Sequence, residues 1–216
     1  MKYKNKKLQI SCDGGAATGK STGAKMISKK YNLKFLSSGL LYRYAGYLLI
    51  KYKPKTKNRL NFLIRKFRNL NYKNLEKINL HTQEISNISA KIAKINKIRN
   101  ILKRYQLNFA KKNKNCCIEG RDISTKILPE SKVKFFFVCD LNTASKRRFR
   151  ELRKNSPKLK LHQVKKAIRI RNISDLNRKN SPLLKHRDSV VIDTGKLSKQ
   201  AMLKKMSNYV EKVLSE

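Results

Sequence analysis

The sequence is poor in acidic residues, in cysteine and in long apolar runs. Only 13 Asp and Glu stand against 54 Lys and Arg, and tryptophan is absent. The longest apolar run, around residues 44–50, is far too short to cross a bilayer. The basic residues 1–7 come almost directly before a glycine-rich loop, with no apolar stretch of signal-peptide length between them. We therefore expect a cytoplasmic protein with no membrane partner.

The scarce cysteines and histidines exclude several kinds of site. Cys12, Cys116, Cys117 and Cys139 lie in apolar stretches without C-x-x-C spacing, which favours buried reduced thiols over a zinc site or a disulfide framework. Three histidines are scattered among basic segments, so the sequence offers no Ser/His/Asp arrangement for nucleophilic catalysis.

The formal charge of +41 is a known footprint of nucleic-acid binding. Here lysine is spread along the whole chain together with many Asn and Ile residues, which indicates a compositional bias that fills solvated positions. We do not expect a specific nucleic-acid partner, although a basic nucleic-acid-binding protein remains one alternative.

A glycine-rich stretch near the start carries the strongest motif. Gly14, four residues, Gly19, Lys20 and Ser21 match the template of a phosphate-binding loop. Residues 8–12 alternate as a strand does, and residues 23–31 have helical spacing. Such a loop between strand and helix points backbone N–H groups at an anion.

Five short apolar segments predict a doubly wound parallel sheet. They cover residues 8–12, 33–36, 115–119, 133–139 and 189–193, with helical patterns between them. We expect core segments at 1–45, 113–148 and 173–216, a helical insertion at 46–112 and a second basic helical segment at 149–172.

Arginines cluster where these strands end. Ser38 to Arg43 follow the second strand, Gly120 to Asp122 follow the third, and a further set, Arg169, Arg171, Asp175 and Arg178, comes later. Ligands of open α/β sheets bind beyond the carboxyl ends of the strands. Several arginines in one crevice suit the binding of two phosphorylated molecules during group transfer.

Seven blocks along the chain, taken in order, resemble the bacterial cytidylate kinases, a family of nucleoside monophosphate kinases. They are "DGGAATGKST", "SSGLLYR", "LHTQEIS", "IEGRDIST", "VKFFFV", "RIRNISDLNRKNSPL" and "VIDTGKLS". The resemblance implies a P-loop kinase fold, with 46–112 as the acceptor-binding insertion and 149–172 as a lid. It also implies transfer of the γ-phosphoryl group of ATP to CMP or dCMP with Mg²⁺, by a protein that we expect to be a monomer.

The resemblance also assigns roles to individual residues. The loop expected to bind ATP comprises Gly14, Gly15, Ala16, Ala17, Thr18, Gly19, Lys20, Ser21 and Thr22, with Ser21 or Thr22 supporting the metal. The residues expected to bind CMP are Ser38, Arg43, Arg121 and Arg178 at the phosphate, Arg171 and Asp175 near the sugar and the transferred group, Arg99 and Asp122 at cytosine, and Tyr42. Lys20, Arg121, Arg171 and Arg178 are the expected catalytic residues.

The chain departs from the family pattern at several positions, namely Gly15, Ser21, His81, Ala90 and Ser124. Ala90 stands where the family carries a serine that touches the base, so selectivity for cytosine is less firmly implied than phosphoryl transfer. The residues by themselves leave open a P-loop kinase for another small acceptor, such as AMP, UMP or shikimate.

Overall fold

The computed structural model describes residues 7–153 and 156–216; the basic residues 1–6, weighed above as a possible signal, lie outside them. Its centre is a five-stranded parallel sheet in the order β2-β3-β1-β4-β5. The strands are β1 (Gln9–Gly14), β2 (Lys34–Ser37), β3 (Cys116–Gly120), β4 (Val133–Val138) and β5 (Val190–Asp193). Helices flank this sheet, which confirms the predicted fold class.

The strand register brings the carboxyl ends of the central strands together. Asp13 on β1 pairs with Gly120 on β3, and Ser37 on β2 pairs with Glu119 on β3. Because all these strands run in the same direction, the loops that follow them open at one edge of the sheet. This edge is where the sequence places its arginines.

Alternation along β3 divides the core between the two faces of the sheet. Cys116 and Ile118 belong to an apolar cluster with the helices that follow β2, whereas Cys117 packs in the cluster that contains α1 and α8. Phe135 and Phe137 on β4 are fully buried. The described strands are therefore covered on both faces, as the near-continuous apolar runs predicted.

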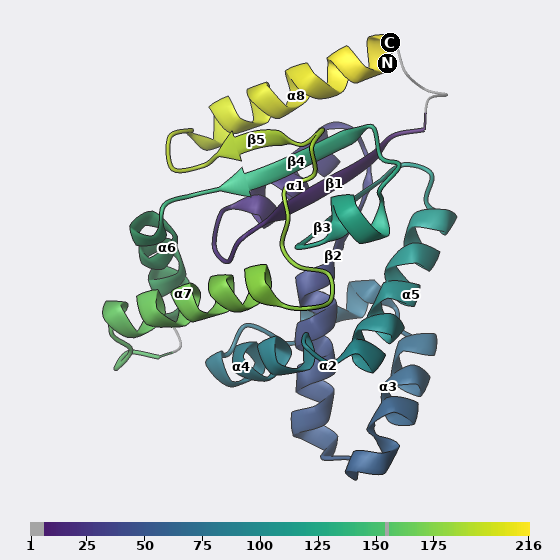
Figure 1. Ribbon diagram of the computed structural model, residues 1–216, viewed down its shortest axis with the longest axis vertical. Coiled ribbons are helices and arrows are strands. Elements are labelled where there is room, and N and C mark those ends of the chain that lie inside the picture. The colour runs from purple at the N-terminus through teal and green to yellow at the C-terminus, as the bar shows by residue number, and fades with distance from the viewer. Residues whose placement is uncertain (1–6, 154–155) are drawn as a thin grey trace.

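Helices α1 (Lys20–Lys30) and α8 (Lys199–Ser215) contact each other beside the sheet. Between β2 and β3 the chain forms α2 (Ser38–Tyr52), α3 (Arg59–Arg68), α4 (Gln83–Ile92) and α5 (Asn96–Lys112), with the short 3-10 helices η1 (Thr56–Asn58) and η2 (Tyr72–Lys77). In Figure 1 these helices extend downward from the sheet, away from α8.

Helices α6 (Leu141–Arg153) and α7 (Leu161–Asn177) pack against each other through Leu152, Val164 and Ile168. Figure 1 shows this pair at the left, beside the sheet edge. No helix of the described residues is long and apolar enough to cross a membrane. The proposed division of the chain into core, insertion and lid stays a prediction.

Candidate active site

A cavity of about 1310 Å³ opens at the carboxyl ends of the strands. Its walls come from the loop before α1, the start of α2, helix α4, the end of β3 and the pair α6 and α7. Among the residues predicted from sequence, those that line it are Ala16, Ala17, Thr18, Gly19, Lys20, Ser21, Thr22, Ser38, Tyr42, Arg43, Arg99, Arg121, Asp122, Arg171, Asp175 and Arg178. Gly14, Gly15 and the exposed Arg169 are not among the lining residues.

Two glycines shape the loop that leads from β1 into α1. A Cβ atom on Gly14 would lie 2.5 Å from the carbonyl oxygen of Phe137, so this position needs glycine for close approach to β4. Gly19 precedes α1 as its N-cap with φ of 78°, in the left-handed region. The loop and the N-terminus of α1 thus form the anion-binding arrangement that the motif predicts.

Hydrogen bonds tie this loop to distant parts of the chain. The backbone N–H of Ala16 donates to Oδ1 of Asn172 on α7 at 2.9 Å. The hydroxyl of Thr194, just after β5, donates to the carbonyl of Thr18 at 2.8 Å. The loop is therefore held in shape without a ligand, which lowers the entropy lost when phosphates bind.

Lys20 points back into the loop. Its Nζ donates to the carbonyl oxygen of Gly15 at 3.1 Å and lies 3.8 Å from Oε2 of Glu119. Burial lowers the pKa of Lys20 to about 7, with Arg121 adding to the shift and Glu119 opposing it. A bound phosphate would therefore restore the charge of this lysine.

Glu119 is a buried carboxylate that the sequence reasoning did not single out. Its Oε1 accepts a hydrogen bond from the hydroxyl of Ser37, the N-cap residue of α2. No hydrogen bond reaches its Oε2 from the described residues. This oxygen is therefore free to accept one from a ligand or its hydration shell.

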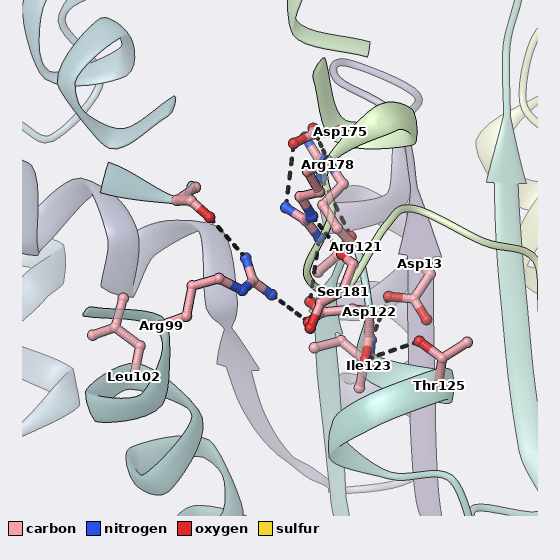
Figure 2. Close-up of polar contacts among 12 residues, drawn as sticks. Asp13, Arg99, Leu102, Arg121, Asp122, Ile123, Thr125, Asp175, Arg178 and Ser181 are labelled. Carbon is pink, nitrogen blue, oxygen red and sulfur yellow. Dashed lines mark hydrogen bonds and ion pairs between the residues drawn. The ribbon is translucent and has the colours of Figure 1, made fainter. Parts of the chain in front are cut away.

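Two aspartates and three arginines form a buried network, which Figure 2 shows in close-up. Arg121 Nε donates to Asp175 Oδ2 at 2.9 Å, and Arg178 Nη1 lies 3.4 Å from Asp175 Oδ1. Asp122 is paired with Arg99 and lies 3.8 Å from Arg178 Nη2. The network fixes the guanidinium groups before any substrate arrives.

Burial and charge act in opposite directions within this network. Burial alone would raise the pKa of Asp175, but Arg121, Arg171 and Arg178 outweigh it and hold that pKa below its ordinary value. Burial, reinforced by Arg121, lowers the pKa of Arg171 to about 10. The Arg171 Nε has no hydrogen-bond partner among the described residues, so the surplus positive charge favours an incoming anion.

Arg99, Asp122 and Tyr42 come together from three different elements. Arg99 on α5 also donates to the carbonyl of Ala93 at 3.2 Å, and its guanidinium lies 5.7 Å from the ring centroid of Tyr42. Burial raises the pKa of Tyr42 to about 12. Arg99 and Asp122, which were predicted at cytosine, thus lie together with Tyr42, predicted only to bind CMP, among the lining residues of the cavity.

Asp13, directly before the glycine-rich loop, holds the segment that follows β3. Its carboxylate accepts from the backbone N–H groups of Ile123 and Ser124 at 2.8 and 2.7 Å, and from the Ser124 hydroxyl at 2.6 Å. These residues begin the π-helix η3 (Ile123–Ile127), whose N-cap is Asp122. Ser124, which departs from the family pattern, therefore adds a third hydrogen bond to Asp13 through its hydroxyl.

Four lining residues were not predicted from the sequence: Glu119, Ser86, Arg147 and Arg148. Asn172, which accepts the hydrogen bond from Ala16 in the phosphate loop, was not predicted either. Arg147 donates to the carbonyl oxygen and the hydroxyl of Thr194 at 2.7 and 2.8 Å. Arg147 and Arg148 lie beside two other basic residues, Lys146 and Arg150, and the general excess of positive charge in the sequence hides them. The helical spacing of this segment was the signal that could have placed Arg147 and Arg148 on the face of α6 toward the cavity and so distinguished them from surface charges.

Comparison with known proteins identifies the family. A family model described as cytidylate kinase matches residues 10–212. A cytidylate kinase of Rickettsia felis is 32% identical over 206 residues, which cover 95% of this chain and 93% of that protein. One from Bartonella henselae is 34% identical, with 91% of each chain covered.

Solved structures agree on the fold. An uncharacterized protein from Eubacterium ventriosum aligns with a TM-score of 0.54 and 15% identity, covering 96% of this chain and 99% of its own. The shikimate kinase of Bacteroides thetaiotaomicron aligns with a TM-score of 0.51 and 11% identity, covering 97% and 99%. Together with the match over residues 10–212, the phosphate loop and the arginine network lead to one assignment: the chain belongs to the cytidylate kinase family.

Proposed function

We propose that the protein transfers the γ-phosphoryl group of ATP to CMP or dCMP, giving ADP and CDP or dCDP. One observation carries this proposal: a single cavity combines a phosphate loop and its lysine with a buried network of arginines and aspartates. The family assignment supports it, and shikimate, AMP or UMP as main acceptor is not favoured.

On the donor side, the loop from Gly14 to Thr22 would bind the phosphates of ATP. Backbone N–H groups at the start of α1 provide donors, and Lys20 would leave Gly15 and Glu119 to contact the phosphates near the transferred group. The low pKa of Lys20 supports this movement, because a buried ammonium gains most from a nearby anion.

Magnesium fits the oxygen groups of this wall. Ser21 and Thr22 are exposed residues that line the cavity, and Glu119 Oε2 has no hydrogen-bond partner within residues 7–153 and 156–216. The described residues contain no group of three or more His, Cys, Asp or Glu that could hold a metal ion, so substrate phosphates would supply the remaining ligands. Bound magnesium would neutralise charge on the donor phosphates.

On the acceptor side, Arg43, Arg121 and Arg178 would bind the phosphate together with the start of α2 at Ser38. Arg171 and Asp175 lie beside Arg121 and would orient the sugar and the transferred group. Arg99 and Asp122 would face cytosine, since they share the wall of Tyr42.

The chemistry asks little of the protein beyond position and charge. An oxygen of the acceptor phosphate attacks the γ-phosphorus of ATP, and the bond between that phosphorus and the bridging oxygen breaks to release ADP. The attacking oxygen is already anionic, so no general base is needed. Lys20, Arg121, Arg171 and Arg178 would stabilise the charge on the transferred group, as preorganised cations do.

We further propose that the protein works as a monomer in the cytoplasm, in pyrimidine nucleotide metabolism. Cysteines 12, 116, 117 and 139 are free thiols, which fits a reducing compartment.

The decisive experiment is a coupled assay of ADP formation with a panel of acceptors. We expect turnover that depends on CMP and dCMP, lower turnover with UMP, and none with shikimate. Turnover with another acceptor above that with CMP would overturn the proposed substrate. No acceptor-dependent turnover at all would favour a binding protein, including one for nucleic acids.

A further inference from the structure

The hydroxyl of Ser86 on α4 is shared by two guanidinium groups from different helices. Arg43 Nη1, on α2, donates to Ser86 Oγ at 2.8 Å, and Arg148 Nη2, on α6, donates to the same oxygen at 3.4 Å. The hydroxyl proton of Ser86 is used in a bond to the carbonyl of Thr82 at 2.7 Å. Its oxygen therefore acts as the acceptor that draws both arginines to one point.

This arrangement concentrates positive charge around a neutral group. The side chain of Arg148 is only 15% exposed, and its partner Glu151, at 2.9 Å, is 63% exposed to solvent. An exposed carboxylate is screened and compensates little of the buried charge. Burial lowers the pKa of Arg43 to about 9, and Arg148 is the strongest of the charged groups that add to this effect.

Two like charges held this close are unfavourable unless an anion joins them. A phosphate has oxygens enough to accept from both planar guanidinium groups, and these match its geometry. Both arginines line the cavity. Arg43 also donates to the carbonyl of Leu80, shortly before α4, at 3.0 Å, and this second bond fixes the position of its guanidinium group.

We infer that Arg148 binds the phosphate of the acceptor nucleotide alongside Arg43, and that Ser86 is the positioning residue that holds both guanidinium groups for it. The inference rests on the proposed function, since it takes the acceptor to be a nucleoside monophosphate. It adds a cation from α6 to a phosphate site otherwise built from α2, β3 and the end of α7.

The test compares Arg148→Ala with Lys146→Ala, which removes an equal charge from an exposed position on the same helix. Equilibrium binding of CMP and of cytidine, which lacks the phosphate, is measured by calorimetry on the full chain. Arg148→Ala should weaken CMP binding roughly ten-fold, as expected for losing a charge-assisted bond, and leave cytidine binding unchanged. Lys146→Ala should change neither.

Three results would overturn the inference. Arg148→Ala could bind CMP as Lys146→Ala does, or weaken cytidine and CMP equally, which would indicate a structural role. It could also weaken the binding of a non-hydrolysable ATP analogue and leave CMP binding unchanged, which would show that Arg148 contacts the donor nucleotide.

Ser86 is tested by rescue. Ser86→Ala should weaken CMP binding about three-fold, because the oxygen that orients two donors is gone, whereas Ser86→Thr keeps the hydroxyl and should restore it. In the Arg148→Ala background, Ser86→Ala should cost less than it does alone. Equal effects of Ala and Thr, or full additivity, would contradict a positioning role.

The wild-type assay separates this inference from the proposed function. If the wild-type enzyme formed no ADP that depends on CMP, the proposed function would be wrong. If the wild-type enzyme turned over CMP normally and Arg148→Ala bound CMP as well as Lys146→Ala, only the inference about Arg148 would be wrong.

Discussion

Arg99 and Asp122, 23 residues apart, form a buried ion pair in which a guanidinium nitrogen meets Oδ2 of the carboxylate. The other carboxylate oxygen, Oδ1, has Arg178 Nη2 at 3.8 Å, beyond hydrogen-bond distance. Arg99 thus orients Asp122 through one oxygen and leaves the second available (Figure 2). Cytosine presents an exocyclic amine donor where uracil has a carbonyl acceptor, so this oxygen suits CMP.

Asp122→Asn tests whether this carboxylate distinguishes the two bases. We expect kcat/KM for CMP to fall roughly 10- to 100-fold, since a charged acceptor is lost. The gap to UMP should narrow, because the amide can donate to the uracil carbonyl. Ala90, which lines the cavity, has no hydroxyl to assist, so wild-type preference should be reduced but real. Unchanged CMP activity and selectivity would show that Asp122 does not contact the base.

Lys20→Ala tests the phosphate loop. Turnover should fall roughly 10³-fold or more, because a preorganised cation near the transferred group is removed. Circular dichroism should show an unchanged fold, and Lys29→Ala, at an exposed position on the same helix, is the matched control. Near-normal turnover would remove Lys20 from the catalytic set.

Asp175→Asn should make stability depend on pH in a defined direction. The arginines lower the pKa of Asp175, so its carboxylate stabilises the fold above the unfolded pKa of about 3.9 and loses this contribution as pH falls through the folded value. We expect a loss of about 3 to 5 kcal/mol near pH 6, as for other buried ion pairs that lose one partner.

The loss caused by Asp175→Asn should begin to shrink as pH falls below the unfolded pKa of about 3.9, and it should vanish below the lowered folded pKa, where the wild-type group is also neutral. Urea unfolding at several pH values measures it. Glu130→Gln, at an exposed position, controls for removing one negative charge from a basic chain. A loss of constant size from pH 3 to 7 would argue against a carboxylate with lowered pKa.

Ala17→Gly should stabilise the protein. Ala17 has φ of 57°, in the left-handed region where a Cβ atom is unfavourable. After the extra freedom of glycine in the unfolded chain is counted, we expect a gain of about 0.5 to 1 kcal/mol. Thermal unfolding is the measurement, and Asn32→Gly, at φ of 52°, should gain less because asparagine tolerates this region. A lower melting temperature for Ala17→Gly would contradict the strain argument.

The sheet was predictable because its signals are local. Residues 133–138 are apolar apart from Lys134, and the structure places β4 there in the sheet interior. The glycine-rich loop likewise shows its spacing within ten residues. The approach of Gly14 to Phe137 and the bonds of the loop to Asn172 and Thr194 needed the structure, since they join residues far apart in the sequence.

Most of the motif residues predicted from the sequence line the cavity, whereas the residues that hold them in place were not predicted. Asp122 and Arg121 stand in a recognisable block, but the bonds from Ser124 to Asp13 span 111 residues and leave no periodic trace. Ser86 and Arg148 are 62 residues apart, Ser86 as one of several polar residues of α4 and Arg148 as one of several basic residues of α6. Such partners depend on tertiary packing, which spacing along a single chain does not encode.

The anchor of Asp13 on η3 also limits how inhibitors of this enzyme could be built. Strand β1 leads into the phosphate loop, and Asp13 near its end binds the segment that begins with Ile123, next to Asp122. The phosphate loop and Asp122, the carboxylate proposed to contact the base, are therefore tied together through Asp13. A compound that joins adenosine to cytidine through a chain of phosphates would meet a fixed span, so its affinity should vary sharply with the number of phosphates in the chain.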